Sequence, residues 1–175
     1  MPDYDQKNAE CLVFTFKDGL LSKIAHDLKL RVTRFRVSVD LSRPFVAVEL
    51  DASSLVVETA MHAGTENPGA LSATDRDKIA SQMRADVLQV SSYPRINFSS
   101  TRALRRADGG YDLSGTLALH GVERELSVQT RVEGNQQVAE VGVHQPDYGI
   151  TVFKAMLGTL KIKPDVRVRL SVPVE

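Results

Sequence analysis

Apolar and polar residues alternate along most of this chain, and this period of two constrains the fold more than any other feature of the sequence. Successive side chains of a β-strand point to opposite faces of a sheet, so the alternation predicts strands. Eight strand candidates follow the pattern: residues 12–16, 28–39, 46–50, 96–98, 113–119, 126–132, 139–143 and 166–170. We therefore predict a mainly β fold.

The alternation changes phase inside the second candidate. Apolar residues from Leu28 to Val32 occupy even positions, whereas those from Phe35 to Val39 occupy odd positions. A slip of one residue turns side chains to the opposite face unless a bulge absorbs it. Strands bent in this way are typical of curved sheets and barrels.

Turn residues separate the later candidates. Asp108-Gly109, His120-Gly121 and Gly134-Asn135 each lie between two alternating segments. Such pairs favour tight hairpin turns, so the chain after residue 95 is predicted to form an antiparallel meander. Residues 59–73 contain two glycines and a proline and are predicted to be a surface loop.

Residues 74–90 break the β pattern. Ile79, Met83 and Val87 are spaced by four residues, which places them on one face of an amphipathic helix. Thr74 is the predicted N-cap residue. A proline shortly after the segment ends the helix.

Eight antiparallel strands favour a closed barrel, because closure removes exposed strand edges. We predict one domain, residues 1–175, folded as an eight-stranded antiparallel barrel with one amphipathic helix between strands. A barrel of this size either holds one small ligand or is filled by its own side chains. The alternation does not distinguish a lined cavity from a filled core.

Charge and cysteine content exclude several classes of function. The chain has 22 basic and 22 acidic residues, so it lacks the basic footprint of a nucleic-acid-binding protein. Its densest basic segment, residues 102–106, lies beside a turn and is interpreted as a solvated hairpin end. Cys11 is the only cysteine, which excludes an internal disulfide and a site with several thiolate ligands.

The first ten residues contain neither a basic n-region nor an apolar segment. This predicts a cytoplasmic protein, or a periplasmic one if a signal has been removed. No segment approaches the ~18 apolar residues that span a membrane, so stable membrane insertion is not expected.

Motifs for catalysis and metal binding are missing from the sequence. His26, His62, His120 and His144 lie far apart without a recognised ligand spacing, and no G-x-S-x-G motif occurs. We interpret His120 as a turn residue. We predict no catalytic residue, no metal site and no cofactor.

The segment SSYPRINFSS and the following GGYDLSGTLALHGVERELSVQTRV resemble the YceI-like family of lipocalin-like proteins. Further matches are the segment DYGI at residues 147–150 and His26 before a strand. The resemblance covers most of the chain. It implies an elongated eight-stranded barrel with a helix, whose interior binds polyisoprenoid lipids or other long amphiphiles.

Strand phase and helix face then suggest which residues contact such a ligand. The predicted barrel lining is Phe14, Phe16, Leu28, Leu30, Phe35, Ile79, Met83, Val87 and Phe98. The predicted contacts for the head group or the barrel mouth are His26, Lys78, Arg84, Phe153, Lys154, Met156 and Leu157. The apolar segment 150–162 is either a flap at the mouth, a plug of the barrel end, or the contact surface of a homodimer.

We therefore expect a non-catalytic protein that binds or carries a long-chain lipid or isoprenoid. Two alternatives remain: a filled barrel that acts through its surface or as a dimer, and an enzyme that uses the cavity as its active site. A bound lipid would support the first expectation over both.

Overall fold

A computed structural model describes residues 2–19, 25–40, 42–155, 158 and 160–174. The strands are β1 (Asp3–Asp5), β2 (Glu10–Thr15), β3 (Asp27–Val32), β4 (Phe35–Asp40), β5 (Phe45–Asp51), β6 (Leu55–His62), β7 (Thr65–Asn67), β8 (Arg95–Arg105), β9 (Tyr111–Leu119), β10 (Val122–Glu133), β11 (Gln136–His144), β12 (Lys154–Ala155), β13 (Leu160–Lys161) and β14 (Asp165–Pro173). The helix α1 (Ala73–Gln82) continues into a π-helical turn, η2 (Met83–Val87), and two 3-10 turns are η1 (Ala52–Ser54) and η3 (Gln145–Tyr148).

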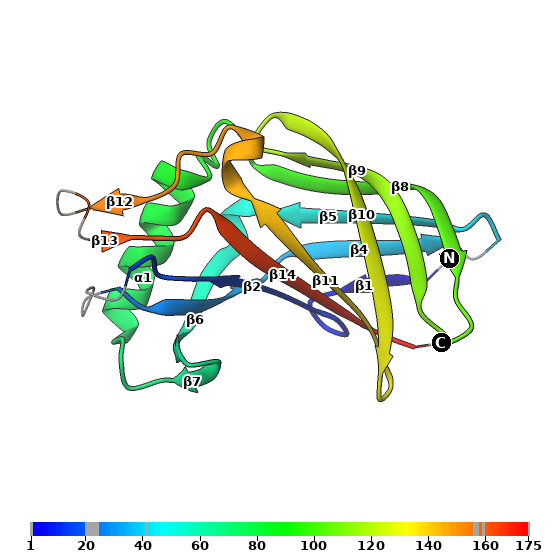
Figure 1. Ribbon diagram of the computed structural model, residues 1–175, viewed down its shortest axis with the longest axis horizontal. Coiled ribbons are helices and arrows are strands. Elements are labelled where there is room, and N and C mark those ends of the chain that lie inside the picture. The colour runs from blue at the N-terminus through cyan, green and yellow to red at the C-terminus, as the bar shows by residue number, and fades with distance from the viewer. Residues whose placement is uncertain (1, 20–24, 41, 156–157, 159, 175) are drawn as a thin grey trace.

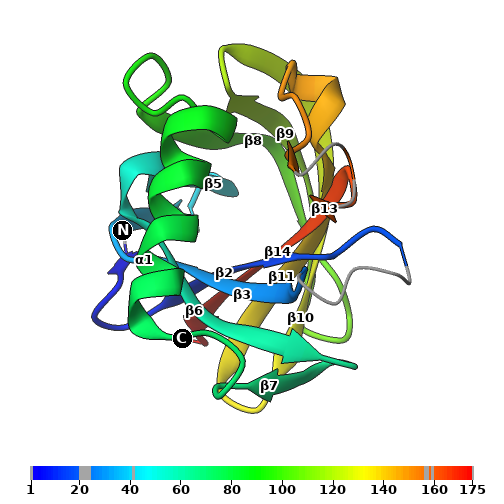
Figure 2. The ribbon, with the colours of Figure 1, turned by 90° about the vertical axis from the view of Figure 1, so that its left-hand side faces the viewer.

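Twelve of the described strands form one curled antiparallel sheet, and the helix lies at one end of it (Figures 1 and 2). Its order is β1-β4-β5-β8-β9-β10-β11-β14-β2-β3-β6-β7, and β12 pairs only with β13. The predicted mainly β fold with one helix is confirmed, and so is the meander from β8 to β11. The predicted closed barrel of eight strands is wrong, because the described sheet is an open half-barrel with β1 and β7 at its edges.

A bend in one hairpin divides the predicted strand 28–39 into β3 and β4, and β1, β6 and β7 are further strands that were not predicted. The chain turns between β3 and β4, where the alternation changes phase, and η1 separates β5 from β6. The bend is held by the Thr33 amide, which donates to the Ser54 carbonyl at 3.2 Å, and by the Asp51 amide, which donates to the Arg34 carbonyl at 3.0 Å. As a result β3 and β6 lie near one edge of the sheet, whereas β4 and β5 lie near the other.

The predicted surface loop at residues 59–73 is wrong over its first half. Residues 59–62 belong to β6, and β7 pairs with them through Met61 opposite Glu66. Ala60 and Thr59 are both buried, because this part of β6 is covered by the sheet and the helix. Of the residues that suggested a loop, Gly64 lies in the turn between β6 and β7, and Pro68 and Gly69 lie after β7.

The helix begins two residues earlier than predicted. Ser72, not Thr74, is the N-cap residue: its hydroxyl accepts from the Asp75 amide at 3.1 Å, and the Asp75 carboxylate accepts from the Ser72 amide at 3.3 Å. Both residues are followed by an aspartate three positions later, so the sequence offers two capping boxes. No helix in the described part of the chain has the length and apolar character needed to cross a membrane.

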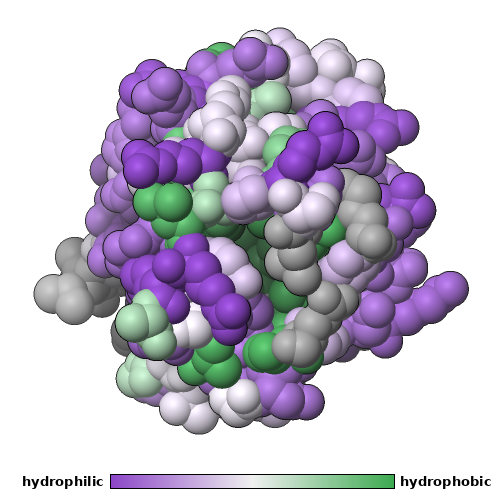
Figure 3. All heavy atoms as spheres, turned by 90° about the vertical axis from the view of Figure 1, so that its right-hand side faces the viewer, coloured by the Kyte–Doolittle hydropathy of each residue, from purple (hydrophilic) through white to green (hydrophobic). Residues whose placement is uncertain are grey.

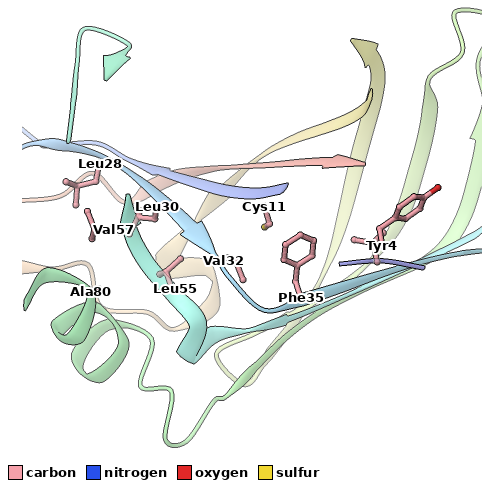
Figure 4. Packing of buried hydrophobic residues seen from close by; sticks show 10 residues of the cluster. Tyr4, Cys11, Leu28, Leu30, Val32, Phe35, Leu55, Val57 and Ala80 are labelled. Atoms are coloured by element: carbon pink, nitrogen blue, oxygen red, sulfur yellow. The ribbon is translucent and has the colours of Figure 1, made fainter. Parts of the chain in front are cut away.

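Two clusters of buried side chains stabilise the fold. The first joins β1 to β6 with α1, and Figure 4 shows Leu28, Leu30 and Val57 near Ala80 of the helix, with Phe35 and Tyr4 farther away. The second cluster contains side chains of β8 to β11 and of the segment at Tyr148 and Ile150. Leu30 is fully buried, as expected for the inner face of a curled sheet.

Cys11 lies in the first cluster with 1% of its surface exposed. Burial, reinforced by the charge of Glu10, raises the pKa of its thiol to about 12. The reactive thiolate is therefore almost absent at neutral pH.

We expect the Cys11 thiol to resist Ellman's reagent in the folded protein and to react within minutes once the protein is unfolded in guanidinium chloride. Measuring the released thionitrobenzoate in both states tests this expectation. Fast and complete reaction in native buffer would show that β2 opens readily, against the burial described here.

Candidate ligand-binding cavity

The concave face of the sheet encloses a cavity of about 690 Å³. Small-molecule sites in proteins usually have volumes of ~300–1,000 Å³, so this cavity has the size of a ligand site rather than of a packing defect. Its wall is mainly aliphatic, with side chains including Leu30, Val32, Val37, Val39, Val46, Val48, Leu50, Leu113, Leu117, Leu126, Val128, Ala139, Val141, Val166, Val168 and Leu170. The described residues therefore form a lined cavity and not a filled core.

The helix covers one end of the cavity, which we call the helix end. Met83, Val87 and Leu88 line it from the helical segment. Arg84 holds this segment against β6, because its Nη1 donates to the Leu55 carbonyl at 3.0 Å. Arg76 of α1 also donates to the Glu58 carbonyl of β6 at 2.9 Å, so hydrophobic contacts and hydrogen bonds together hold the helix in place.

The opposite end, which we call the open end, lies where β4 meets β5 and where β8 meets β9. Asp40, Phe45, Arg105, Tyr111 and Val174 line the cavity there. Phe45 is 37% exposed and Val174 is 44% exposed, so apolar surface continues from the cavity to the outside. Figure 3 shows this end with hydrophobic atoms deep in a hollow between hydrophilic ones.

Most polar groups in the wall are already occupied. The Thr130 hydroxyl accepts from the Tyr111 amide at 2.9 Å and from the Gln137 side chain. The Gln145 side chain donates to the Lys163 carbonyl at 3.3 Å. These groups are hydrogen-bonded within the protein, whereas the buried Thr15 hydroxyl has no partner among the described residues; the rest of the wall is suited to hydrocarbon.

Four of the nine predicted lining residues border the cavity: Leu30, Met83, Val87 and Phe98. Leu28, Phe35 and Ile79 pack in the first cluster without bordering the cavity. Leu28 is buried near the start of β3, and Phe35 is buried where β4 begins after the bend. Their predicted contact with a ligand in this cavity therefore has no direct geometric support.

Phe14 and Phe16 lie on the outer face of the sheet, so their predicted inward orientation is wrong. In β2 the cavity is lined by Val13 and Thr15 instead. The Arg167 guanidinium lies over the Phe16 ring, 5.6 Å from its centroid. Residues 12–16 are apolar on both faces, so the alternation alone does not show which face is buried.

The predicted head-group residues do not border the cavity in the described part of the chain. Lys78 is exposed on the helix, Lys154 is exposed in β12, and His26 lies in a separate small depression with Met61 and His62. The Phe153 carbonyl accepts from the Ile162 amide at 3.3 Å.

The last two of these candidates, Met156 and Leu157, lie outside the described residues. The charged residues Asp40 and Arg105 border the cavity at its open end instead.

His120 occupies the turn between β9 and β10, as predicted, with a positive φ of 53°. Its Nδ1 lies 3.2 Å from the Tyr148 carbonyl oxygen, and its Nε2 lies 2.9 Å from Oε1 of Gln89. Its ring also packs on Tyr93 at 4.3 Å between centroids. His120 therefore joins the turn to the segment after the helix, a link that sequence patterns do not reveal.

The described residues contain no group of three or more His, Cys, Asp or Glu side chains arranged to hold a metal ion. Asp51, which borders the cavity, is engaged at the η1 turn, where it accepts from the Ser53 amide at 2.9 Å. The cavity wall is thus better suited to apolar contact than to ion binding.

Solved structures with the same fold are distant in sequence. BcnA of Burkholderia cenocepacia superposes with a TM-score of 0.66 at 12% identity, covering 98% of this chain and 99% of that one. A polyisoprenoid-binding domain from Saccharophagus degradans, implicated in plant cell wall breakdown, gives 0.60 at 14% identity, covering 94% and 91%. The YceI protein of Campylobacter jejuni gives 0.54 at 12% identity, covering 90% and 94%.

No curated protein matches the sequence closely enough to count as a relative. The family model described as the YceI-like domain, in contrast, matches residues 7–174. That match covers nearly the whole chain, including every strand of the curled sheet after β1. The chain therefore belongs to the YceI-like family.

Proposed function

We propose that this protein binds a long-chain amphiphilic lipid of the polyisoprenoid type in its cavity and catalyses no reaction on it. The observation that carries the proposal is the cavity of about 690 Å³ with its mainly aliphatic wall. Transfer of each methylene group from water to such a wall contributes about 0.8 kcal/mol. Hydrocarbon burial alone therefore supplies substantial affinity.

The family and the fold support the choice of ligand. The solved domain from Saccharophagus degradans is described as polyisoprenoid-binding, and it shares the fold of this chain. Isoprenoid chains are branched and apolar, which suits a wall built from Val and Leu side chains.

The state of the polar groups supports a binding role over catalysis. Thr130, Gln137 and Gln145 are hydrogen-bonded within the protein. General acid–base catalysis requires a titratable group within hydrogen-bond reach of the substrate. Among the described residues, the charged side chains bordering the cavity are Asp40, Asp51 and Arg105, and they lie at its ends.

Native mass spectrometry of the protein purified from its host tests the proposal. We expect a protein mass increased by that of a long-chain lipid, which organic extraction releases unchanged. A ligand-free protein that also fails to bind added isoprenoid alcohols would overturn the proposal. A ligand-free dimer would favour a role exerted through the surface, and chemical conversion of the bound lipid would favour an enzyme.

A further inference from the structure

A β-bulge in β8 decides which side chains of this strand face the cavity. The pairing of β8 with β9 shifts by one residue between Ser100 and Arg102. Phe98 lines the cavity before the bulge, and Arg105 lines it after the bulge. Without the extra residue the faces would be exchanged, and Leu104 would point inward in place of Arg105.

This arrangement opposes the usual preference of a leucine side chain. Leu104 is 47% exposed on the outer face, while the charged Arg105 lies at the edge of an apolar cavity. Arg105 is itself exposed there, so the cost of the arrangement lies with Leu104, whose burial would stabilise the fold more. Local conflicts of this kind concentrate at functional sites.

The surrounding residues are adapted to the bulge. The Val46 amide, which lies beyond the last residue pair of β5 and β8, donates to the Ser100 hydroxyl at 2.8 Å. Gly115 faces the bulge so closely that a Cβ there would lie 2.7 Å from the Cα of Ser100. Specific contacts from both neighbouring strands therefore stabilise the bulge.

The two neighbouring arginines at the end of β8 differ in their partners. Arg106 donates to Asp112 at 2.9 Å and to the Thr130 carbonyl at 2.7 Å, and it forms an ion pair with Asp108. The Arg105 side chain forms neither a hydrogen bond nor an ion pair with any residue that the structure describes. Arg106 thus stabilises the turn, whereas the N–H donors of the Arg105 guanidinium remain available to bind a ligand.

Asp40, the acidic residue at the same end of the cavity, is already engaged. Its carboxylate accepts from the Ser42 hydroxyl at 2.6 Å and from the Ser42 amide at 3.0 Å, and it pairs with Arg43 at 3.6 Å. These contacts compensate its negative charge within its own turn. Of the two charged residues that the structure describes in the cavity wall at the open end, Arg105 is therefore the one whose charge is uncompensated.

We propose that Arg105 binds the anionic head group of the amphiphile, a phosphate or a carboxylate, while the chain occupies the cavity. This inference rests on the proposed function and adds the polarity and the orientation of the ligand. A guanidinium offers two parallel N–H donors that match both anions. The ligand therefore enters with its apolar tail first and reaches the helix end with that tail.

Titration calorimetry with two probes tests the proposal: farnesyl phosphate and farnesol, which share a chain and differ in charge. For Arg105→Gln we expect the affinity for farnesyl phosphate to fall about tenfold or more, since hydrogen bonds to charged groups are among the stronger ones. The affinity for farnesol should change less than about twofold, because the chain contacts remain. Added salt should weaken the binding of farnesyl phosphate and leave the binding of farnesol unchanged.

Arg102→Gln is the matched control, because Arg102 is exposed on the same strand and does not border the cavity. We expect it to bind both probes like the unchanged protein. Equal losses for both probes in Arg105→Gln, no loss for either, or the same loss in the control would each overturn the role of Arg105. If the unchanged protein binds neither probe, the proposed function fails together with this inference, whereas binding of farnesol alone overturns only this inference.

Discussion

Replacing Ala139 with phenylalanine is expected to reduce the affinity for farnesol by at least about tenfold. Ala139 lies in β11 and borders the cavity, so a phenyl ring at this position occupies space that the ligand chain needs. Displacing only two methylene groups, at about 0.8 kcal/mol each, accounts for a loss of this size. The ring fills an empty volume, so the melting temperature should stay within a few degrees of its original value.

Ala118→Phe provides the matched control. Ala118 lies in β9 between Leu117 and Leu119, which both border the cavity, so Ala118 points to the outer face. The same enlargement there should leave farnesol binding unchanged in titration calorimetry. If Ala139→Phe binds as tightly as the unchanged protein, the ligand does not occupy this part of the cavity, and if both variants lose affinity equally, the effect does not come from the cavity.

The second large effect is expected for Gly115→Ala, which should lower the free energy of unfolding by about 3 kcal/mol. The added Cβ would lie 2.7 Å from the Ser100 Cα and 2.8 Å from the Phe98 ring, and would clash with the Ser99 carbonyl oxygen. Two of these neighbours belong to the backbone of the bulge and have little freedom to move. Urea unfolding followed by circular dichroism measures the change.

Gly142→Ala is the control for this substitution. Gly142 also lies in a central strand, but a Cβ there would meet no atom within 4 Å. Because alanine restricts the unfolded chain more than glycine does, this variant should be as stable as the original protein or slightly more stable. If the free energy of unfolding falls no more for Gly115→Ala than it changes for Gly142→Ala, then β8 and β9 do not pack closely at the bulge.

Sequence patterns predicted the class of this fold because strand periodicity is local. The alternation identified most of the long strands but missed β6, and its change of phase between Val32 and Phe35 indicated the bend that the structure has there. It did not show that the bend sends β3 and β4 to opposite edges of the sheet. That outcome depends on hydrogen bonds between residues far apart in the chain, such as Thr33 and Ser54.

The candidate site was predicted less completely, for a related reason. Leu30, Met83 and Phe98 were predicted correctly as residues of the inner face, because their neighbours in sequence are more polar or follow a helical period. Phe14 was not, because β2 is apolar on both faces and only its partners β3 and β14 decide which face is inside.

Arg105 was interpreted as part of a solvated hairpin end. Its orientation depends on the bulge at Ser100, and that bulge depends on Gly115 in the neighbouring strand. The sequence by itself determined the mainly β class, the helix, the apolar character of the interior and the family resemblance, all of which depend on residues close together in the chain. Only the tertiary structure decided that the sheet stays open, that a cavity remains, and which end of it carries the free charge, because these properties depend on how distant strands are placed in register.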